Sequence, residues 1–401
     1  MEELPGGLTA PLGWSAGATY TGIRSYGPEP RFDLGLLLSE RPATAAALFT
    51  RNAVVGAPVT LTRDRVARGP ARALVVNSGN SNVATGAAGE ADAERMAELA
   101  AAALGVDPAD VLVASTGVIG RRLPMDRIEA GIAEIALSRE GGALFARAMM
   151  TTDTRPKEHA LRVEAGGRSY IVGGAAKGAG MIHPDMATMF GFLTTDAPAE
   201  RGWLQDTLRE VTDRSFNMID VDMDTSTSDM VIALANGAAG GDPIEAGHPA
   251  AAPLASAIEA VAVRLARELA RDGEGARTLI EVVAEGAASD ADARVAARTI
   301  SSSPLVKTMI TGRDPNWGRV LMAAGRSGAA LDLERAEVWI GEFCAFERGA
   351  PTTTPEADIS AAMDRDEVQI RIDLGCGEAS ATAWGCDLTE EYVRINADYT
   401  T

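Results

Sequence analysis

The sequence predicts a mixed α/β protein with two domains, on the strength of three observations. The chain has 401 residues, more than an average single domain needs. Short runs with strand character alternate with alanine-rich helical segments. Apolar residues make up 46% of the sequence but aromatic residues only 4%, so small aliphatic side chains must do most of the core packing.

In the first half of the chain, strands are followed by polar turns and helices. Residues 31–40 read as a short alternating run that leads into a helix-like segment at 43–52, ATAAALFTRN. A buried strand at 73–76 runs into a polar turn, and an alanine-rich helix at 90–105 ends at its glycine. The segment 111–122, VLVASTGVIGRR, repeats the order of strand and loop, and a helical stretch is expected near 124–150.

The second half continues with a strand and glycine loop at 169–180 and a helix at 204–215. Asp220, Asp222 and Asp224 then alternate with apolar residues at the period of a strand. A long amphipathic helix is expected at 252–272. Shorter elements follow, with SSPLVKT and DPNWGRVLMAAG as loops and a last strand through YVRINADYTT at 392–401.

The composition excludes several classes of protein. A net charge of −19 and a pI near 4.7 argue against binding to nucleic acid or to an anionic membrane. No apolar run reaches the roughly 18 residues of a membrane span, and MEELPGGL is unlike a signal peptide. Cys344, Cys376 and Cys386 match neither a disulfide framework nor a CxxC pair, so reduced thiols are expected. These features fit a cytoplasmic protein.

The segment 173–196 is the strongest candidate for a functional site. Four glycines allow tight turns and close backbone approach, and Lys177 is the only cation among them. Thr188 stands directly before MFGFL, an apolar run with strand character. A hydroxyl at the mouth of a buried strand, beside a glycine loop, is well placed to act as a nucleophile.

Metal and phosphate sites are not expected. The sequence has neither HExxH nor a cysteine-histidine metal spacing. Asp220, Asp222 and Asp224 resemble the start of a calcium loop, but no glycine occupies the sixth position and Val231 replaces the bidentate glutamate. In GGAAKGAG the lysine precedes its glycine and no serine or threonine follows it, unlike a phosphate-binding P-loop.

Histidine is scarce, which limits the choice of a base. The three histidines are His159, His183 and His248; only His183 lies beside the glycine loop, where a packing or hydrogen-bonding role is the commoner one. A hydroxyl nucleophile can instead use its own α-amine, exposed by cleavage of the preceding peptide bond. The pKa of such an amine is near 7.7–8.0, so it can accept the hydroxyl proton at neutral pH.

Six motifs carry a resemblance to a known family. In chain order they are STGVIG, MTTDTRPK, KGAGMIHPDMATM, DGEG, DPNWGR and YVRINADYTT. Together, along essentially the whole chain, they resemble the ornithine acetyltransferase family, or glutamate N-acetyltransferases, of arginine biosynthesis. The resemblance implies a precursor that cuts itself between Ala187 and Thr188. Thr188 would then head the second piece, as the nucleophile with its free amine as the base.

The resemblance also assigns the neighbouring residues. It implies an oxyanion hole at Thr116 and Gly117, formed by a hydroxyl and a backbone N–H. On their own, these residues also fit an ordinary turn at the end of a strand. The substrate-binding positions implied by the resemblance are Thr154, Lys177, Thr188, Glu274, Asn396 and Thr401. Without it, Glu274 would read as an exposed helix end, and Asn396 and Thr401 as a frayed tail.

The fold implied by the resemblance is a layered α-β-β-α sandwich, related to self-processing enzymes with an N-terminal nucleophile, with a smaller C-terminal α/β domain. The α chain would be residues 1–187 and the β chain 188–401. Residues 188–285 would complete the sandwich, and 286–401 would form the smaller domain. The αβ pairs would associate further, into a heterotetramer.

The implied reaction is a ping-pong transfer of acetyl from N-acetylornithine to glutamate through acetyl-Thr188, without a bound cofactor. Acetyl-CoA is a second acetyl donor that the resemblance leaves open. Three alternatives remain: an N-terminal-nucleophile aminopeptidase or amidase, the same transfer in a secondary-metabolite pathway, and a binding protein without catalysis. Asp185 replaces the usual asparagine before MATM, which leaves the self-cleavage rate open. Arg277 and Thr278 replace the last two residues of the usual DGEGATK motif.

Overall fold

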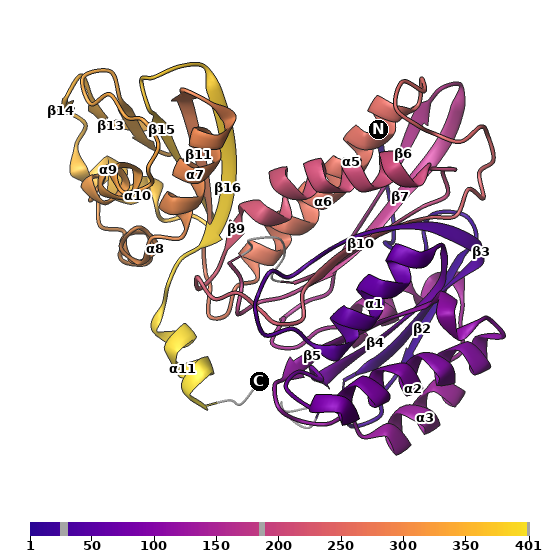
Figure 1. The fold of residues 1–401 in the computed structure, drawn as a ribbon. Coiled ribbons are helices and arrows are strands. Elements are labelled where there is room, and N and C mark those ends of the chain that lie inside the picture. The colour runs from indigo at the N-terminus through magenta and orange to yellow at the C-terminus, as the bar shows by residue number, and fades with distance from the viewer. Residues whose placement is uncertain (25–30, 184–188, 399–401) are drawn as a thin grey trace.

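Two β-sheets with helices packed on them form the molecule (Figure 1). The computed structural model describes residues 1–24, 31–183 and 189–398. The larger sheet contains β1 (Glu2–Leu4), β2 (Trp14–Thr19), β3 (Leu34–Phe49), β4 (Ala71–Asn80), β5 (Val111–Val118), β6 (Lys157–Ala165), β7 (Arg168–Lys177), β8 (Phe190–Thr195) and β10 (Met230–Ala235). Its helices are α1 (Ala57–Arg68), α2 (Gly86–Leu104), α3 (Met125–Glu134), α4 (Gly142–Ala148), α5 (Arg201–Arg214) and α6 (Ala251–Arg271).

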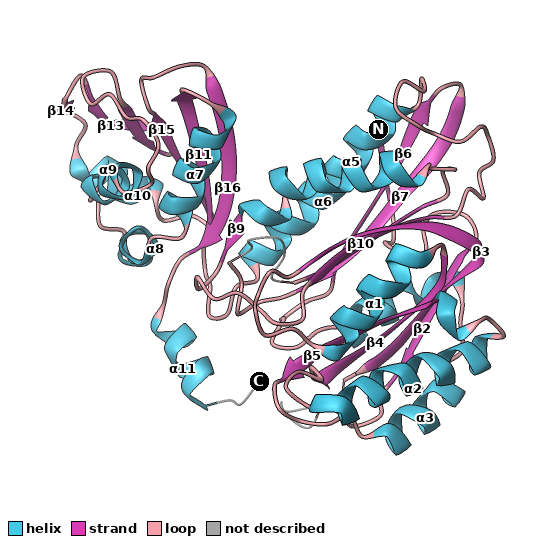
Figure 2. Cartoon of the chain, in the orientation of Figure 1, coloured by secondary structure: helices cyan, strands magenta, loops and turns pink. Residues whose placement is uncertain are grey.

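The larger sheet is folded into two layers by β3. The first part of this strand pairs with β2 and β4, and its last part pairs with β10. Apolar side chains fill the space between the layers, among them Phe145, Phe190 and Phe192. Helices α5 and α6 cover one outer face, and α2 and α3 cover the other (Figure 2). The predicted layered α-β-β-α sandwich is therefore confirmed.

Helix α6 shows how the sequence builds an outer layer. Its apolar residues recur every three or four positions, which puts them on one face of a helix. That face packs against the sheet and is fully buried at Leu254, Val261, Leu265 and Leu269.

The middle of the larger sheet has the strand order β7-β8-β10-β3. Strand β8 runs antiparallel to β7, with Lys177 opposite Phe190. It runs parallel to β10, with Met230 opposite Phe190. The start of β8 therefore lies between the end of β7 and the start of β10, and this edge of the sheet holds the candidate site.

The smaller sheet contains β9 (Ile219–Asp220), β11 (Leu279–Ala287), β12 (Glu337–Ile340), β13 (Phe343–Glu347), β14 (Ala350–Pro351), β15 (Glu367–Asp373) and β16 (Ala379–Cys386). With it lie α7 (Asp290–Ser301), α8 (Pro304–Gly312), α9 (Gly318–Gly325) and α10 (Glu356–Ala362). The last described helix, α11 (Glu390–Asp398), lies near the larger sheet. The predicted domain boundaries at 187, 285 and 286 stay predictions.

The structure corrects the secondary structure expected for two segments, 43–52 and 392–401. The segment 43–52, expected to be helix-like, continues as strand β3 to Phe49, because its alanines form ladders with β4 and β10 between closely packed layers. The last strand expected over 392–401 is wrong for its described part. Residues 390–398 form helix α11, whose Asn396 and Tyr392 reach back to Glu274 and Asp222.

A third expectation, strand structure through the aspartates at 220–224, holds only for Asp220. Strand β9 ends there, and 221–229 form a loop. Asp222 stabilises this loop by accepting hydrogen bonds from the backbone N–H groups of Met181, Ile182 and Asp224. The expected loops SSPLVKT and DPNWGRVLMAAG also become helical in α8 and α9.

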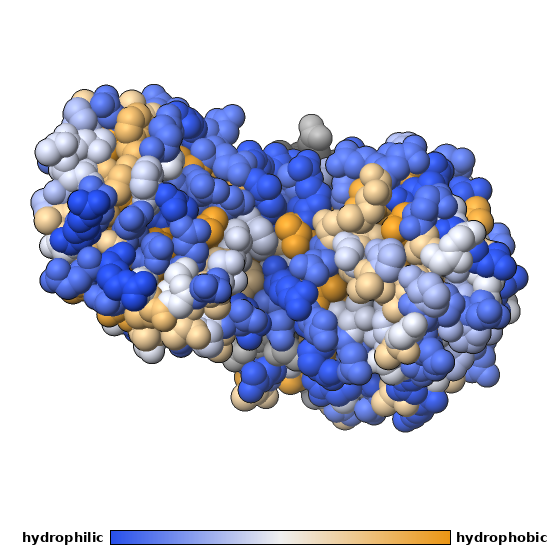
Figure 3. Space-filling model, turned by 90° about the horizontal axis from the view of Figure 1, so that it is seen from above, coloured by the Kyte–Doolittle hydropathy of each residue, from blue (hydrophilic) through white to orange (hydrophobic). Residues whose placement is uncertain are grey.

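The face seen from above is mostly hydrophilic, and the two bodies meet there at a narrower middle (Figure 3). None of the helices in the described ranges is both long and apolar enough to cross a membrane. All three cysteines are free, as expected.

Candidate functional site

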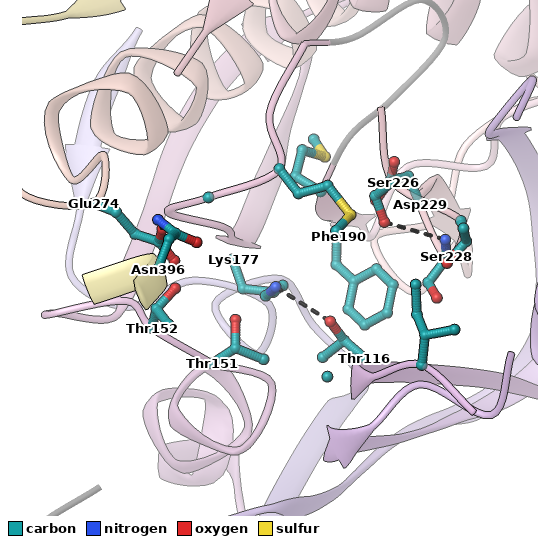
Figure 4. Close-up of a pocket in the computed structure, with 16 residues that line it drawn as sticks. Thr116, Thr151, Thr152, Lys177, Phe190, Ser226, Ser228, Asp229, Glu274 and Asn396 are labelled. Atoms are coloured by element: carbon teal, nitrogen blue, oxygen red, sulfur yellow. Dashed lines mark hydrogen bonds between the residues drawn. The ribbon is translucent and has the colours of Figure 1, made fainter. Parts of the chain in front are cut away.

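A pocket opens at the edge of the larger sheet where β8 begins. Its walls come from the ends of β5 and β7, the loop before β10, the loop after α6 and helix α11 (Figure 4). The residues that line it are Thr116, Gly117, Ile119, Thr151, Thr152, Lys177, Gly180, Met181, Met189, Phe190, Ser226, Thr227, Ser228, Asp229, Glu274 and Asn396. Five of the residues implied by the resemblance therefore share one pocket.

Thr116 and Gly117 lie near the end of β5, next to β4. Gly117 is opposite Gly79, and its φ of +120° is one that side-chain-bearing residues rarely adopt. A Cβ on Gly117 would lie 2.4 Å from the carbonyl carbon and oxygen of Gly79. The glycine at this position is thus required by the close approach of the two strands.

Lys177 ends β7 and is almost fully buried. Its ammonium donates a hydrogen bond to the hydroxyl of Thr116 over 3.2 Å and lies 6.0 Å from the centre of the Phe190 ring. Burial lowers the pKa of Lys177, although the charges of Asp153 and Asp229 partly offset this effect. The result is a desolvated cation at the pocket wall, suited to a carboxylate ligand.

A buried ionic network supports the pocket floor behind Lys177. Lys157 Nζ lies 2.6 Å from both Asp153 Oδ1 and Asp272 Oδ2. Asp153 also accepts hydrogen bonds from the backbone N–H groups of Thr151 and Gly178. Burial raises the pKa of Asp153, but the charges of Lys157 and Lys177 outweigh this and hold that pKa well below its usual range. The network fixes the loop that carries Thr151 and the turn after Lys177.

Glu274 brings an acidic group to the opposite wall. Its backbone N–H donates to the carbonyl of Ala179 over 2.7 Å, and Asn396 donates from Nδ2 to its Oε2 over 2.7 Å. A Cβ on Gly180 would lie 2.5 Å from this carboxylate. A glycine at 180 therefore leaves the room that Glu274 occupies. Asn396, expected by composition alone to lie in a frayed tail, is held in the pocket by helix α11.

Of the remaining predicted site residues, only Thr154 is described, and it does not line this pocket. Thr154 donates from its hydroxyl and its backbone N–H to Asp272 and lines a neighbouring pocket. Ala187, Thr188 and Thr401 lie outside the described residues, as does Asp185. The nearest described residue to the expected cleavage site is Met189, which lines the pocket.

Sequence reasoning missed six polar residues that line the pocket: Thr151, Thr152, Ser226, Thr227, Ser228 and Asp229. Asp229 is 3% exposed, and burial raises its pKa well above the usual range, against the opposing effects of Ser226 and Lys177. The signal was present in TSTSD, where hydroxyl residues and an acid directly precede an apolar strand.

His183 lies outside the pocket and has a structural partner. Its Nδ1 is 2.8 Å from Asp220 Oδ1, and Asp220 also pairs with the buried Lys307 over 2.9 Å. Burial raises the pKa of Asp220, but Lys307 and His183 together bring it below the ordinary value. Across the described part of the chain, no cluster of histidine, cysteine and acidic residues could hold a metal ion.

Comparisons with known proteins agree along the whole chain. A sequence profile described as the ArgJ family matches residues 15–401. The arginine biosynthesis bifunctional protein ArgJ of Symbiobacterium thermophilum is 52% identical, and the alignment covers 100% of each of the two chains. Its namesake from Dehalococcoides mccartyi is 48% identical, over 100% of this chain and 99% of the other.

A solved structure is also similar. The crystal structure of the arginine biosynthesis bifunctional protein of Bacillus halodurans has a TM-score of 0.50 and 43% identity, over 52% of this chain and 98% of that one. These matches confirm the family that the motifs indicated and an enzyme of the acyltransferase class. The chain belongs to the ArgJ family.

Proposed function

We propose that this protein transfers the acetyl group of N-acetylornithine to glutamate, with Thr188 as the nucleophile, after self-cleavage between Ala187 and Thr188. The observation that carries the proposal is the pocket beside Met189. There Thr116, Gly117, Lys177 and Glu274 line the same pocket as Met189, which directly follows the residue that would become a new N-terminus. The described residues lining this pocket include no histidine, which fits an amine as the base.

In the first half-reaction, the Thr188 hydroxyl oxygen attacks the acetyl carbonyl and its proton passes to the Thr188 amine. The hydroxyl of Thr116 and the N–H of Gly117 would stabilise the oxyanion that forms. The amide C–N bond then breaks, and the amine returns the proton to the leaving nitrogen of ornithine. The acetyl group remains on Thr188 as an ester.

In the second half-reaction, the α-amine of glutamate attacks this ester. The Thr188 amine takes a proton from the attacking nitrogen, the C–O bond breaks, and the Thr188 oxygen regains its proton. N-acetylglutamate leaves and the enzyme returns to its first state. Ornithine and glutamate share an α-carboxylate, which Lys177 would bind, while Glu274 would pair with a substrate ammonium.

The partners in this proposal are N-acetylornithine, glutamate and the two pieces of one precursor, assembled as oligomers of αβ pairs in the cytoplasm. Thr154 and Thr401 belong, with Asn396, to the proposed set of substrate-binding residues. No bound cofactor takes part in any step. Acetyl-CoA is an additional donor to be tested, since the curated relatives carry the name bifunctional protein.

Intact-mass measurement of the purified protein tests the proposal. Two pieces in place of one 41.6 kDa chain, with the cut between 187 and 188, are expected. Incubation with N-acetylornithine should add one acetyl group to the second piece. Thr188→Ala should stay uncut and inactive, and an active Thr188→Ala protein would overturn the proposal.

A second measurement separates the proposal from its rivals. Labelled N-acetylornithine should give labelled N-acetylglutamate when glutamate is present. Free acetate as the main product would indicate an amidase, and an uncut chain without an acetyl adduct would indicate a binding protein. Replacing N-acetylornithine by acetyl-CoA tests the second donor.

A further inference from the structure

Asp229 lies directly before β10, at the same edge of the sheet as the start of β8. The parallel register pairs Met230 with Phe190, and the Met230 N–H donates to the carbonyl of Met189 over 3.2 Å. Asp229 is therefore level with Met189. On the other side of β8, Lys177 is opposite Phe190. The strand that would open the second piece thus begins between a buried acid and a buried cation.

The side chain of Asp229 has unused hydrogen-bonding capacity. It is 3% exposed and lines the pocket, yet among the described residues its Oδ2 has no hydrogen-bond partner. A buried acceptor without a partner is unfavourable, so such groups are few in folded proteins and call for an explanation. A donor that arrives or becomes charged only during the reaction supplies one.

The surroundings of Asp229 favour a cationic partner. Burial raises the pKa of Asp229 well above its ordinary value, and the nearby hydroxyl of Ser226 and the charge of Lys177 oppose this effect. A cation that forms beside the buried side chain would therefore stabilise its charged form, which burial alone disfavours.

We propose that Asp229 is a positioning residue, whose carboxylate accepts a hydrogen bond from the Thr188 amine and stabilises the ammonium that forms when this amine takes the hydroxyl proton. This inference rests on the proposed function. No bond to Asp229 forms or breaks, and its role is to orient the amine toward the hydroxyl and to offset the new positive charge. Such a contact would do the work of a histidine, and none is found among the described residues that line the pocket.

The test compares Asp229→Asn and Asp229→Glu with the wild type, with rates expressed per cleaved molecule as counted by intact mass. Asp229→Asn is expected to lower kcat by roughly tenfold to hundredfold, at or below the roughly 10²–10⁴-fold that a general acid or base contributes, because Asp229 only positions the amine. The KM for N-acetylornithine should change little. Because a carboxylate raises the pKa of a neighbouring amine, its loss should move the acid limb of the rate profile to lower pH. Asp229→Glu should leave the acid limb of the rate profile at the wild-type pH and lower kcat only in part.

Asp196→Asn is the matched control. Asp196 is also a buried acid of this sheet, but it follows the far end of β8 and accepts hydrogen bonds from the backbone N–H groups of Leu12 and Ile171. Its replacement should lower stability and leave the pH profile in place. A wild-type rate and profile in both Asp229 variants would overturn the role of Asp229 alone, provided that Thr188→Ala is inactive.

If Asp229→Asn remains a single chain, Asp229→Glu decides the question. A Glu variant as fast as the wild type at every pH would show that the position of the carboxylate is unimportant and would overturn the proposal. An active Thr188→Ala protein would instead overturn the proposed function, so the two failures are distinguishable.

Discussion

Lys177 and Thr116 are joined by a hydrogen bond although their strands, β7 and β5, lie far apart in the order of the larger sheet. The bond spans the open edge between the two layers of the sandwich. It holds a desolvated ammonium against the hydroxyl that is proposed to bind the oxyanion. This contact thereby joins the proposed carboxylate ligand to the proposed oxyanion hole.

Lys177→Met tests the charge at this contact. The variant should raise KM for both N-acetylornithine and glutamate at least about tenfold, because a charge-assisted hydrogen bond to a carboxylate contributes about 1.5–3 kcal/mol. Steady-state kinetics measures the change. Lys307→Met removes another buried lysine, which pairs with Asp220 outside the pocket. It should cost about 3–5 kcal/mol of stability without changing KM, and equal KM effects in the two variants would argue against a substrate role for Lys177.

Gly117→Ala tests the close approach of β4 and β5. The new Cβ would collide with the backbone of Gly79, so urea unfolding should show a loss of more than about 2 kcal/mol, with loss of activity. Gly120→Ala is the control, since Gly120 also has a positive φ, +81°, but a Cβ there meets nothing within 4 Å. If both variants lose the same stability, backbone strain rather than the strand contact is responsible.

Gly180→Ala should act through Glu274. The backbone at 180 accepts an alanine, but its Cβ would reach the carboxylate of Glu274 and displace this flexible side chain. KM should rise while stability changes by less than about 0.5 kcal/mol. In a Glu274→Gln background, Gly180→Ala should add little, since both changes act on one group. Additive effects on KM in the double variant would contradict this coupling.

Asp153→Asn should flatten the acid dependence of stability. The pKa of Asp153 is lowered in the folded protein, so the unfolded chain binds more protons as the pH falls. The stability from this carboxylate is fully present above its unfolded pKa, about 3.9, and is lost as the pH falls below that value. At pH 7 the variant should be about 3 kcal/mol less stable, and the difference from wild type should shrink in acid.

Urea unfolding from pH 7 down to pH 3 measures this dependence. Asp206→Asn, which breaks an exposed pair with Arg209, should change stability by less than about 1 kcal/mol at any of these pH values. A difference between Asp153→Asn and wild type that stays constant with pH would show that the carboxylate acts through packing and not through its charge.

Local patterns predicted the fold best where one element needs only its own sequence. The alanine-rich helix before Gly105 and the amphipathic helix through Leu265 follow from propensity and period. The prediction for the segment around Ala46 failed because alanine favours helices, whereas the hydrogen-bonded ladder with β10 overrides that preference. Helix α11 was missed because its position depends on Asn396 reaching Glu274, a contact distant in sequence.

The candidate site was predicted in part. Motifs alone indicated Lys177 and the glycine loop, and the resemblance added Thr116, Glu274 and Asn396, all of which the structure brings together. Asp229 was missed because it lies outside the alternating pattern of Asp220, Asp222 and Asp224. Its significance depends on the register between β8 and β10, and one sequence does not specify which strands will be neighbours.

The strand order in the middle of the larger sheet has a consequence for assembly. A cut at the proposed bond puts β8 and β10 in one piece, flanked on both sides by β7 and β3 of the other. Strands of one piece would then lie between strands of the other, so the pieces could not separate without breaking two hydrogen-bonded ladders. Mature molecules should therefore not exchange pieces when two differently labelled preparations are mixed, and folding of the uncut precursor is the only efficient route to the active form.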